Sequence, residues 1–152
     1  MRKIVVALIA LSGVAGAKIV SDTHKTFSVN APDSWKFHRG ADSRGVAQAG
    51  WKNEKNTGAL LLTAVPVKEK SLEDWAKGAA RQNPKTAILD EKLAGQPAKR
   101  LEFTTDEGYA HVLWLTRKGK NGAMLSLVYT AECPDDMPAI RKSIVSSFRW
   151  TK

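Results

Sequence analysis

The chain has 152 residues, with 24 lysine and arginine residues against 15 aspartate and glutamate residues, so its formal net charge is +9. This length is sufficient for one domain with a single hydrophobic core. Cys133 is the single cysteine, which excludes an intrachain disulfide, so the stability of the fold must come from its core.

The first seventeen residues have the pattern of a secretory signal. Arg2-Lys3 form a short basic region, residues 4–11 are an apolar run, and residues 15–17 (AGA) fit a small-residue cleavage site. The apolar run is shorter than the roughly 20 residues that a membrane-spanning helix needs. No cysteine follows it to accept a lipid. We therefore expect cleavage near Ala17 and a mature chain, residues 18–152, without a transmembrane segment. The short signal looks bacterial, so we expect a periplasmic or secreted protein.

Removal of Arg2 and Lys3 with the signal leaves 22 basic and 15 acidic residues, a net charge of +7. One explanation is solubility together with a basic face. The other is attraction to an anionic component of the cell envelope or to an acidic protein partner. An exported chain without a recognition motif gives no indication of nucleic-acid binding.

The N-terminal half of the mature chain reads mainly as strands and turns. In chain order we expect a short strand at 19–20, a strand at 26–29, a turn at 30–34, a loop at 38–44, a weak strand at 46–52, a turn at 53–58 and a strong strand at 59–67. Pro66 should mark the end of the last strand or an edge of the sheet, because proline lacks an amide donor. Trp35 is expected in the core.

A first helix is predicted to begin at Ser71. Ser71 lies three residues before Asp74, which is a capping-box pattern. One apolar stripe follows at helical spacing, made of Leu72, Trp75, Ala76, Ala79 and Ala80. Asn83-Pro84 should end the helix, because the residue before a proline avoids the helical region.

After a strand at 86–93 and a turn at 95–97, residues 98–131 contain three strand-like runs. Residues 106–108 and 118–122 are turn signals between them, which predicts an antiparallel meander. The strands do not alternate cleanly between apolar and polar residues: Val112 and Trp114 would lie on one face, and Leu113 and Leu115 on the other. A sheet that is apolar on both faces must be covered on both.

A second helix is predicted to start near Asp136, because Pro138 is tolerated only in a first turn and acidic residues suit a helix N-terminus. Its apolar stripe consists of Met137, Ile140, Ile144, Val145 and Phe148. Two helices and a sheet that needs two covers predict an α+β fold in which an antiparallel sheet is sandwiched between helices.

With these elements placed, the chain resembles the PsbP-like superfamily, including small bacterial exported proteins and the DcrB-like group. Four stretches carry the resemblance in this order: residues 27–35 (FSVNAPDSW), 71–76 (SLEDWA), 93–104 (LAGQPAKRLEFT) and 144–148 (IVSSF). The resemblance implies a single PsbP-like domain over residues 18–152, with an α/β/α arrangement. Members of this superfamily look like binding and assembly accessories and have no shared catalytic residues to carry over.

No catalytic, cofactor or metal motif is found. The histidines His24, His38 and His111 lack zinc-binding spacing, and the glycines fall in turns rather than in a phosphate-binding loop. Cys133 with His111 is the thiol–imidazole pair to consider, although acidic neighbours of Cys133 disfavour a thiolate. We predict that the chain is not an enzyme.

Two basic turns are the candidate binding sites. One contains Arg117, Lys118 and Lys120, and the other contains Lys52 and Lys55 beside Trp51. An aromatic residue or an arginine at a hairpin tip can anchor an interface. The competing explanation is that lysines keep strand edges and tips soluble.

Three hypotheses follow. The first is a non-catalytic exported accessory that binds another envelope protein or an anionic envelope component. The second is a periplasmic inhibitor or immunity-type protein that blocks one specific enzyme. The third is a small thiol-dependent enzyme, which requires a histidine within hydrogen-bonding reach of Cys133. The sequence leaves the identity of the partner and the oligomeric state open.

Overall fold

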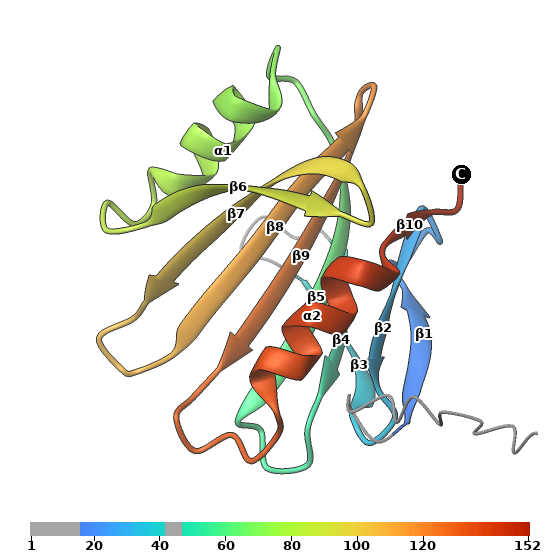
Figure 1. Ribbon diagram of the computed structural model, residues 1–152, viewed down its shortest axis with the longest axis vertical. Helices are drawn as coiled ribbons and strands as arrows, with labels where there is room; N and C mark the ends of the chain where they lie inside the picture. The colour runs from blue at the N-terminus through green and yellow to red at the C-terminus, as the bar shows by residue number, and fades with distance from the viewer. Residues whose placement is uncertain (1–15, 42–46) are drawn as a thin grey trace, which may run out of the picture.

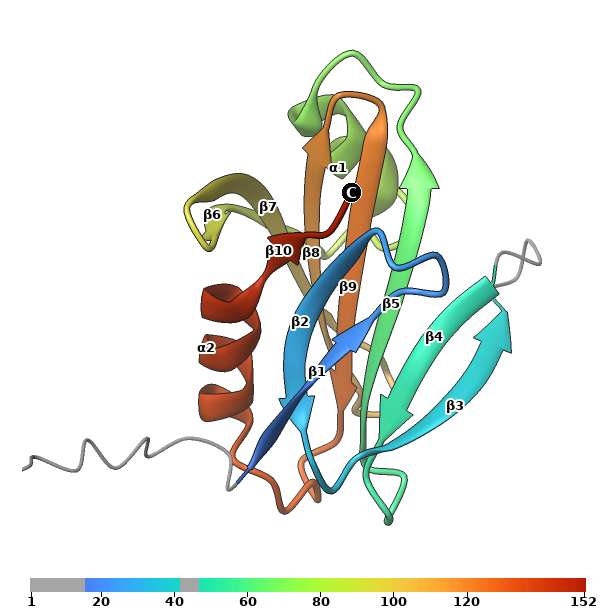
Figure 2. The same cartoon turned by 90° about the vertical axis from the view of Figure 1, so that its right-hand side faces the viewer.

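The computed structural model describes residues 16–41 and 47–152, which form two helices and two antiparallel sheets (Figures 1 and 2). The small sheet has the order β1 (Ala17–Ser21), β2 (Phe27–Pro32) and β10 (Arg149–Trp150). The large sheet has the order β3 (Lys36–Ala41), β4 (Ala47–Lys52), β5 (Gly58–Pro66), β9 (Asn121–Tyr129), β8 (Ala110–Lys118), β7 (Gln96–Thr104) and β6 (Ala87–Leu93). The helices are α1 (Leu72–Ala80) and α2 (Met137–Ser147). The expected α+β class is confirmed.

The predicted meander is confirmed as β7, β8 and β9, which pair with their sequence neighbours. The turn that leads into it differs by a residue from the expected 95–97. Ala94 and Gly95 form a two-residue turn with φ values of +47° and +84°, and Leu93 pairs directly with Gln96. Two consecutive residues with positive φ give the turn whose twist matches that of the flanking strands. Gln96 and Pro97 therefore already belong to β7.

Residues that alternate along β8 and β9 enter two separate cores. Trp114 and Leu125 belong to the larger core, together with Ile140 and Ile144 of α2. Leu115 belongs to the smaller core, which α1 contributes to. Alternate side chains of a strand point to opposite faces, so both faces of the large sheet carry apolar contacts, as the sequence predicts.

The side of the large sheet that α2 covers is shared with the small sheet. Phe27 and Val29 of β2 are fully or almost fully buried in the same core as α2. Figure 2 shows β1 and β2 lying beside α2 in front of the large sheet. The arrangement therefore departs from a simple stack of helix, sheet and helix, because a second sheet fills part of one layer.

Side-chain caps start both helices. The Ser71 hydroxyl accepts a hydrogen bond from the amide of Asp74 at 3.0 Å, and the Asp136 carboxylate accepts one from the amide of Ala139 at 3.1 Å. Each bond satisfies an amide that has no partner within its helix. The apolar stripes of both helices face the cores as expected. Neither helix in the described ranges is long and apolar enough to cross a membrane.

The structure differs from the sequence expectations in four further places. Helix α1 ends at Ala80 rather than at Asn83-Pro84, because the amide of Asn83 turns back to the carbonyl of Ala80 at 3.1 Å. Strand β2 extends to Pro32, which pairs with Ala17 of β1. Residues 38–41 of the expected loop belong to β3, and residues 42–46 lie outside the described residues. The two-residue strand β10 was not expected.

Most of the predicted signal, residues 1–15, also lies outside the described residues. Gly16 and Ala17 are described, and Ala17 is the first residue of β1.

Candidate functional site

The two predicted basic turns lie at opposite ends of the large sheet. The register between β5 and β9 pairs Pro66 with Asn121 at one end and Gly58 with Tyr129 at the other. Eight residue steps of extended strand separate these ends by about 27 Å. Figure 1 shows the β8–β9 turn at the upper end of the sheet and the β4–β5 turn at the lower end. The structure therefore does not combine the two groups of basic residues into one site.

Trp51 is buried, with 6% of its surface exposed. Its ring packs against Phe37, with ring centroids 5.4 Å apart, and its strand position is opposite Leu60. Trp51 is thus part of the core and does not offer an exposed anchor next to Lys52. Lys52 and Lys55 themselves are exposed, and a binding role for them stays a prediction.

The β8–β9 turn is joined by basic residues that are distant in sequence. The amide of Val67 donates to the carbonyl of Lys120 at 2.8 Å, which places the loop before α1 against this turn. The side chain of Lys118 donates to the carbonyl of Lys152 at 3.3 Å. We call the resulting surface the basic end, and it comprises Lys68, Lys70, Arg117, Lys118, Lys120 and Lys152.

Arg117 fixes the geometry of the basic end. Its Nε donates to the carbonyl of Gly119 at 2.9 Å, and its Nη1 donates to the carbonyl of Glu69 at 2.8 Å. The guanidinium thus ties the turn to the β5–α1 loop while it remains half-buried. Lys68, Lys70 and the other lysines of the basic end are exposed, and Glu69 is the one acidic residue in the segments 67–70 and 117–121. The result is a concentrated positive field that attracts anions.

Lys68, Lys70 and Lys152 were missed by the sequence reasoning. The length of the strand at 59–67 could have indicated the positions of Lys68 and Lys70. Once this strand is paired with the last strand of the meander, its end must lie beside the turn at 118–122.

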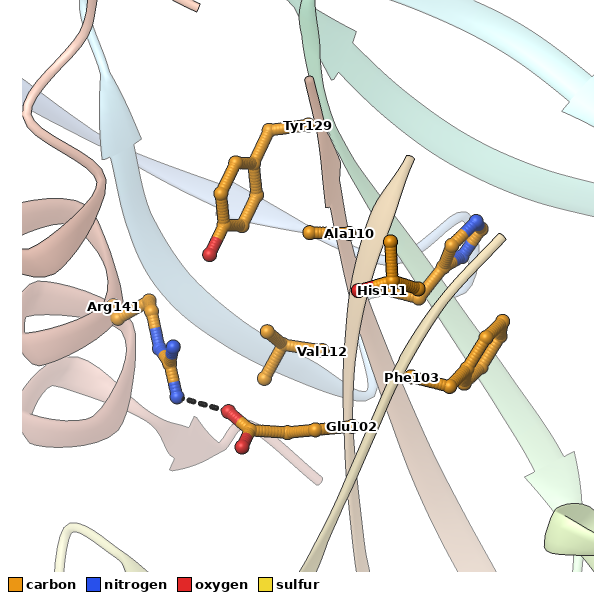
Figure 3. A pocket seen from close by; sticks show the side chains of 8 residues that line it. Glu102, Phe103, Ala110, His111, Val112, Tyr129 and Arg141 are labelled. Carbon is orange, nitrogen blue, oxygen red and sulfur yellow. Dashed lines mark hydrogen bonds and ion pairs between the residues drawn. The ribbon is translucent and has the colours of Figure 1, made fainter. Parts of the chain in front are cut away.

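At the other end of the sheet, a hollow of about 300 Å³ lies between strands β7–β9 and helix α2. Its lining residues are Glu102, Phe103, Thr104, Ala110, His111, Val112, Tyr129 and Arg141. Figure 3 shows that the side chains of Glu102, Val112, Tyr129 and Arg141 lie on the α2 side of the strands. The rings of Phe103 and His111 lie on the opposite side, stacked on each other with centroids 4.5 Å apart.

A row of alternating charges runs into this hollow from the edge of the sheet. Glu91 pairs with Arg100, Arg100 lies near Glu102, and Glu102 pairs with Arg141 of α2. These side chains are between 22% and 31% exposed. Partial burial makes such charge-assisted contacts stronger than fully exposed pairs. The row attaches α2 to β6 and β7 and orients the guanidinium of Arg141.

The structure does not bring Cys133 and His111 together. The Cys133 thiol contacts the side-chain nitrogen Nδ2 of Asn53 at 3.6 Å, a carboxylate oxygen of Asp135 at 3.5 Å and the sulfur of Met137 at 3.6 Å. Cys133 packs against the larger core, whereas the His111 ring lies on the other side of the sheet. The predicted pair of Cys133 and His111, which a thiol-dependent enzyme would require, is therefore not formed. Within 16–41 and 47–152, no three histidine, cysteine or acidic side chains gather in a way that could hold a metal ion.

Comparison with known proteins identifies the fold. No family model matches the sequence, and no curated protein matches it either. Among solved structures, PsbP (CyanoP) from the cyanobacterium Synechocystis sp. PCC 6803 is similar over 91% of this chain and 95% of its own, with a TM-score of 0.63 and 14% identity. The protein Mog1, solved as a variant, is similar over 89% of this chain and 96% of its own, with a TM-score of 0.58 and 12% identity.

A protein from Bacteroides thetaiotaomicron is also similar over 84% of this chain, with a TM-score of 0.57 and 15% identity. The similarity spans 46% of that longer protein. The chain thus has a PsbP-like fold, as the four sequence stretches predicted. At these low identities, the similarity shows the fold alone.

Proposed function

We propose that the protein is a non-catalytic accessory of the bacterial cell envelope that binds an anionic partner through its basic end. The observation that supports this function is the convergence of exposed lysines from two chain segments. Lys68 and Lys70 lie beside Lys118 and Lys120 because main-chain and arginine hydrogen bonds join the segments. Lysines that serve only to keep one hairpin tip soluble would not require a second chain segment to be held beside that tip.

The charges of the basic end are expected to strengthen this binding. A lysine near an anionic surface contributes about 1 kcal/mol, and salt screens this contribution. Three lysines therefore contribute on the order of a hundredfold in affinity. Arg117 holds the two segments together, so it should be left intact when the charges are tested.

The test compares two triple variants with the same change in net charge. In the first, Lys68, Lys70 and Lys120 are changed to glutamine at the basic end. In the matched control, Lys36, Lys52 and Lys55 are changed to glutamine at the opposite end, where the register pairs Lys36 with Lys52. We expect the first variant to lose about a hundredfold in affinity for the captured partner and the control to lose little. Equal losses in both variants would contradict a localised site.

Affinity capture from an envelope extract at low and high salt identifies the partner class. One partner that survives high salt, and that the basic-end variant fails to retain, would be a dedicated protein partner. Capture of many anionic components at low salt alone would mean that net charge is the main attraction, and the specific accessory function would then be wrong.

The envelope location is part of the same proposal and rests on residues 1–17 of the sequence. Cleavage near Ala17 would leave Lys18–Ser21 of β1 in place, and the Lys18 side chain donates to the carbonyls of Asp33 and Trp35. We expect the exported protein to begin at Lys18 when its mass is measured from a bacterial envelope fraction. A protein that keeps residues 1–17 in the cytoplasmic fraction would refute this location.

A further inference from the structure

We propose that the hollow between strands β7–β9 and helix α2 is a binding site for a carboxylate that carries a small apolar body. In this site the ligand carboxylate pairs with the guanidinium of Arg141, and its apolar part lies on Ala110, Val112 and the ring of Tyr129. This site is separate from the basic end, because Ala110 and Lys118 are the opposite ends of β8.

The hydrogen-bonding groups around the hollow have more donors than acceptors. One oxygen of Glu102 accepts from the Nη2 of Arg141 and lies 3.5 Å from the Nε of Arg100, which is buried without a hydrogen-bond partner among the described residues. An arginine has five N–H donors, and Glu102 is the one acceptor that Arg141 has within 16–41 and 47–152. The remaining donors suit a second carboxylate, since a guanidinium binds carboxylates in a bidentate manner.

The same arrangement selects against a cationic ligand. The carboxylate of Glu102 already faces two guanidinium groups, so an incoming ammonium group would approach Arg100 and Arg141 as well as the acid. A ligand carboxylate would instead place a second acidic group beside the Arg141 guanidinium, in addition to Glu102. The hydroxyl of Tyr129 points into the hollow from the opposite wall (Figure 3) and can donate to the same carboxylate.

Ala110 and Val112 supply the aliphatic part of a lining that also includes the polar residues Thr104 and His111. Val112 is 2% exposed and is held by the larger core, and Ala110 lies next to Tyr129 across the strand pair. A volume of about 300 Å³ is at the small end of the range for ligand pockets. It therefore fits a single ring or a short aliphatic chain. Such a group can belong to a free acid or to the C-terminal residue of a peptide.

The experiment is an amide NMR titration of the whole exported chain with phenylacetate. We expect saturable shifts at Ala110, Val112, Tyr129 and Arg141. Phenylacetamide, which has the same shape without the charge, should shift them at least tenfold less at equal concentration. A short N-acetylated peptide that ends in phenylalanine distinguishes the sources: shifts with both probes mean a C-terminal residue, and shifts with phenylacetate alone mean a small acid.

Three variants test the assignment. Arg141→Gln should weaken phenylacetate binding at least tenfold, whereas Glu102→Gln, which frees the guanidinium of Arg141, should retain or strengthen it. Lys142→Gln, at an exposed neighbour on α2, should leave binding unchanged. Equal shifts with phenylacetamide, no shifts with either acid, or binding that survives Arg141→Gln in a folded protein would overturn the site. The triple variant at the basic end should not alter this titration, so the two proposals can fail independently.

Discussion

Gly122, the second residue of β9, lies where the chain has no room for a side chain. A Cβ atom at this position would be 2.4 Å from a methyl group of Val67 and 2.7 Å from the ring of Trp75. Both neighbouring side chains are buried, so they have little room to move aside. We expect Gly122→Ala to lower the free energy of unfolding by about 1–3 kcal/mol, because an overpacked core must distort. Urea unfolding followed by circular dichroism measures this loss.

Gly78 in α1 is the matched control, since a Cβ atom there meets nothing within 4 Å. Gly78→Ala should stabilise the protein by about 0.5–1 kcal/mol, because alanine loses less backbone entropy in a helix. Equal effects of the two substitutions would mean that the contact between β9 and α1 is looser than the structure indicates.

His111 should make stability depend on pH. Burial lowers the pKa of its imidazole below the ordinary value of 6.5, so the unfolded chain takes up a proton before the folded chain does as the pH falls. The contribution of the neutral ring is fully present above pH 6.5 and is lost progressively below it. We expect His111→Gln to reduce the difference between urea midpoints measured at pH 7.5 and pH 5.0. An unchanged difference in His111→Gln would contradict this assignment.

At the scale of single elements, α1 depends on its N-terminal cap. Ser71→Ala removes the acceptor of the Asp74 amide and should cost about 1 kcal/mol, whereas Ser71→Asp supplies another acceptor and should cost little. Because Trp75 and Ala76 pack on Leu101 and Leu115, the loss should appear in the thermal unfolding of the whole protein. A loss confined to helix content at low temperature would instead indicate local fraying.

The elements that the sequence predicted best are those with a strong local pattern. The stripes of α1 and α2 and the three strands of the meander were correctly placed because each is defined by apolar residues that enter a core. The edge strand β3 was missed because Lys36, Arg39 and Gly40 are exposed and read as a loop. Because β3 is an edge strand that pairs on one side only, its exposed positions can be polar.

Long-range contacts account for the features that the sequence did not provide. Strand β10 consists of Arg149 and Trp150, too short for any periodicity, and it exists because β2 offers a free edge. The contact of the β5–α1 loop with the β8–β9 turn depends on the register of β5 against β9, and the hollow at Arg141 depends on where α2 crosses the sheet. Residue spacing alone does not show which strands pair or where a helix crosses the sheet.

At the scale of the whole molecule, the two cores are joined by shared strands. Leu115 in β8 and Leu125 in β9 are both fully buried, but they belong to different cores. Each strand contributes to both cores through alternate residues. Loss of one core therefore removes support from the strands on which the other is built.

We accordingly expect the protein to unfold in one cooperative step. Leu115→Ala and Leu125→Ala should each lower the free energy of unfolding by about 2–5 kcal/mol, and in each variant tryptophan fluorescence and far-ultraviolet circular dichroism should give the same urea midpoint. Fluorescence reports on both cores, since Trp75 lies in one and Trp35 and Trp114 lie in the other. If Leu115→Ala produced an early fluorescence transition with the strand signal intact, the layer formed by α1 would be an independent unit. The basic end, which lies beside the start of that helix, could then change shape without unfolding the sheet.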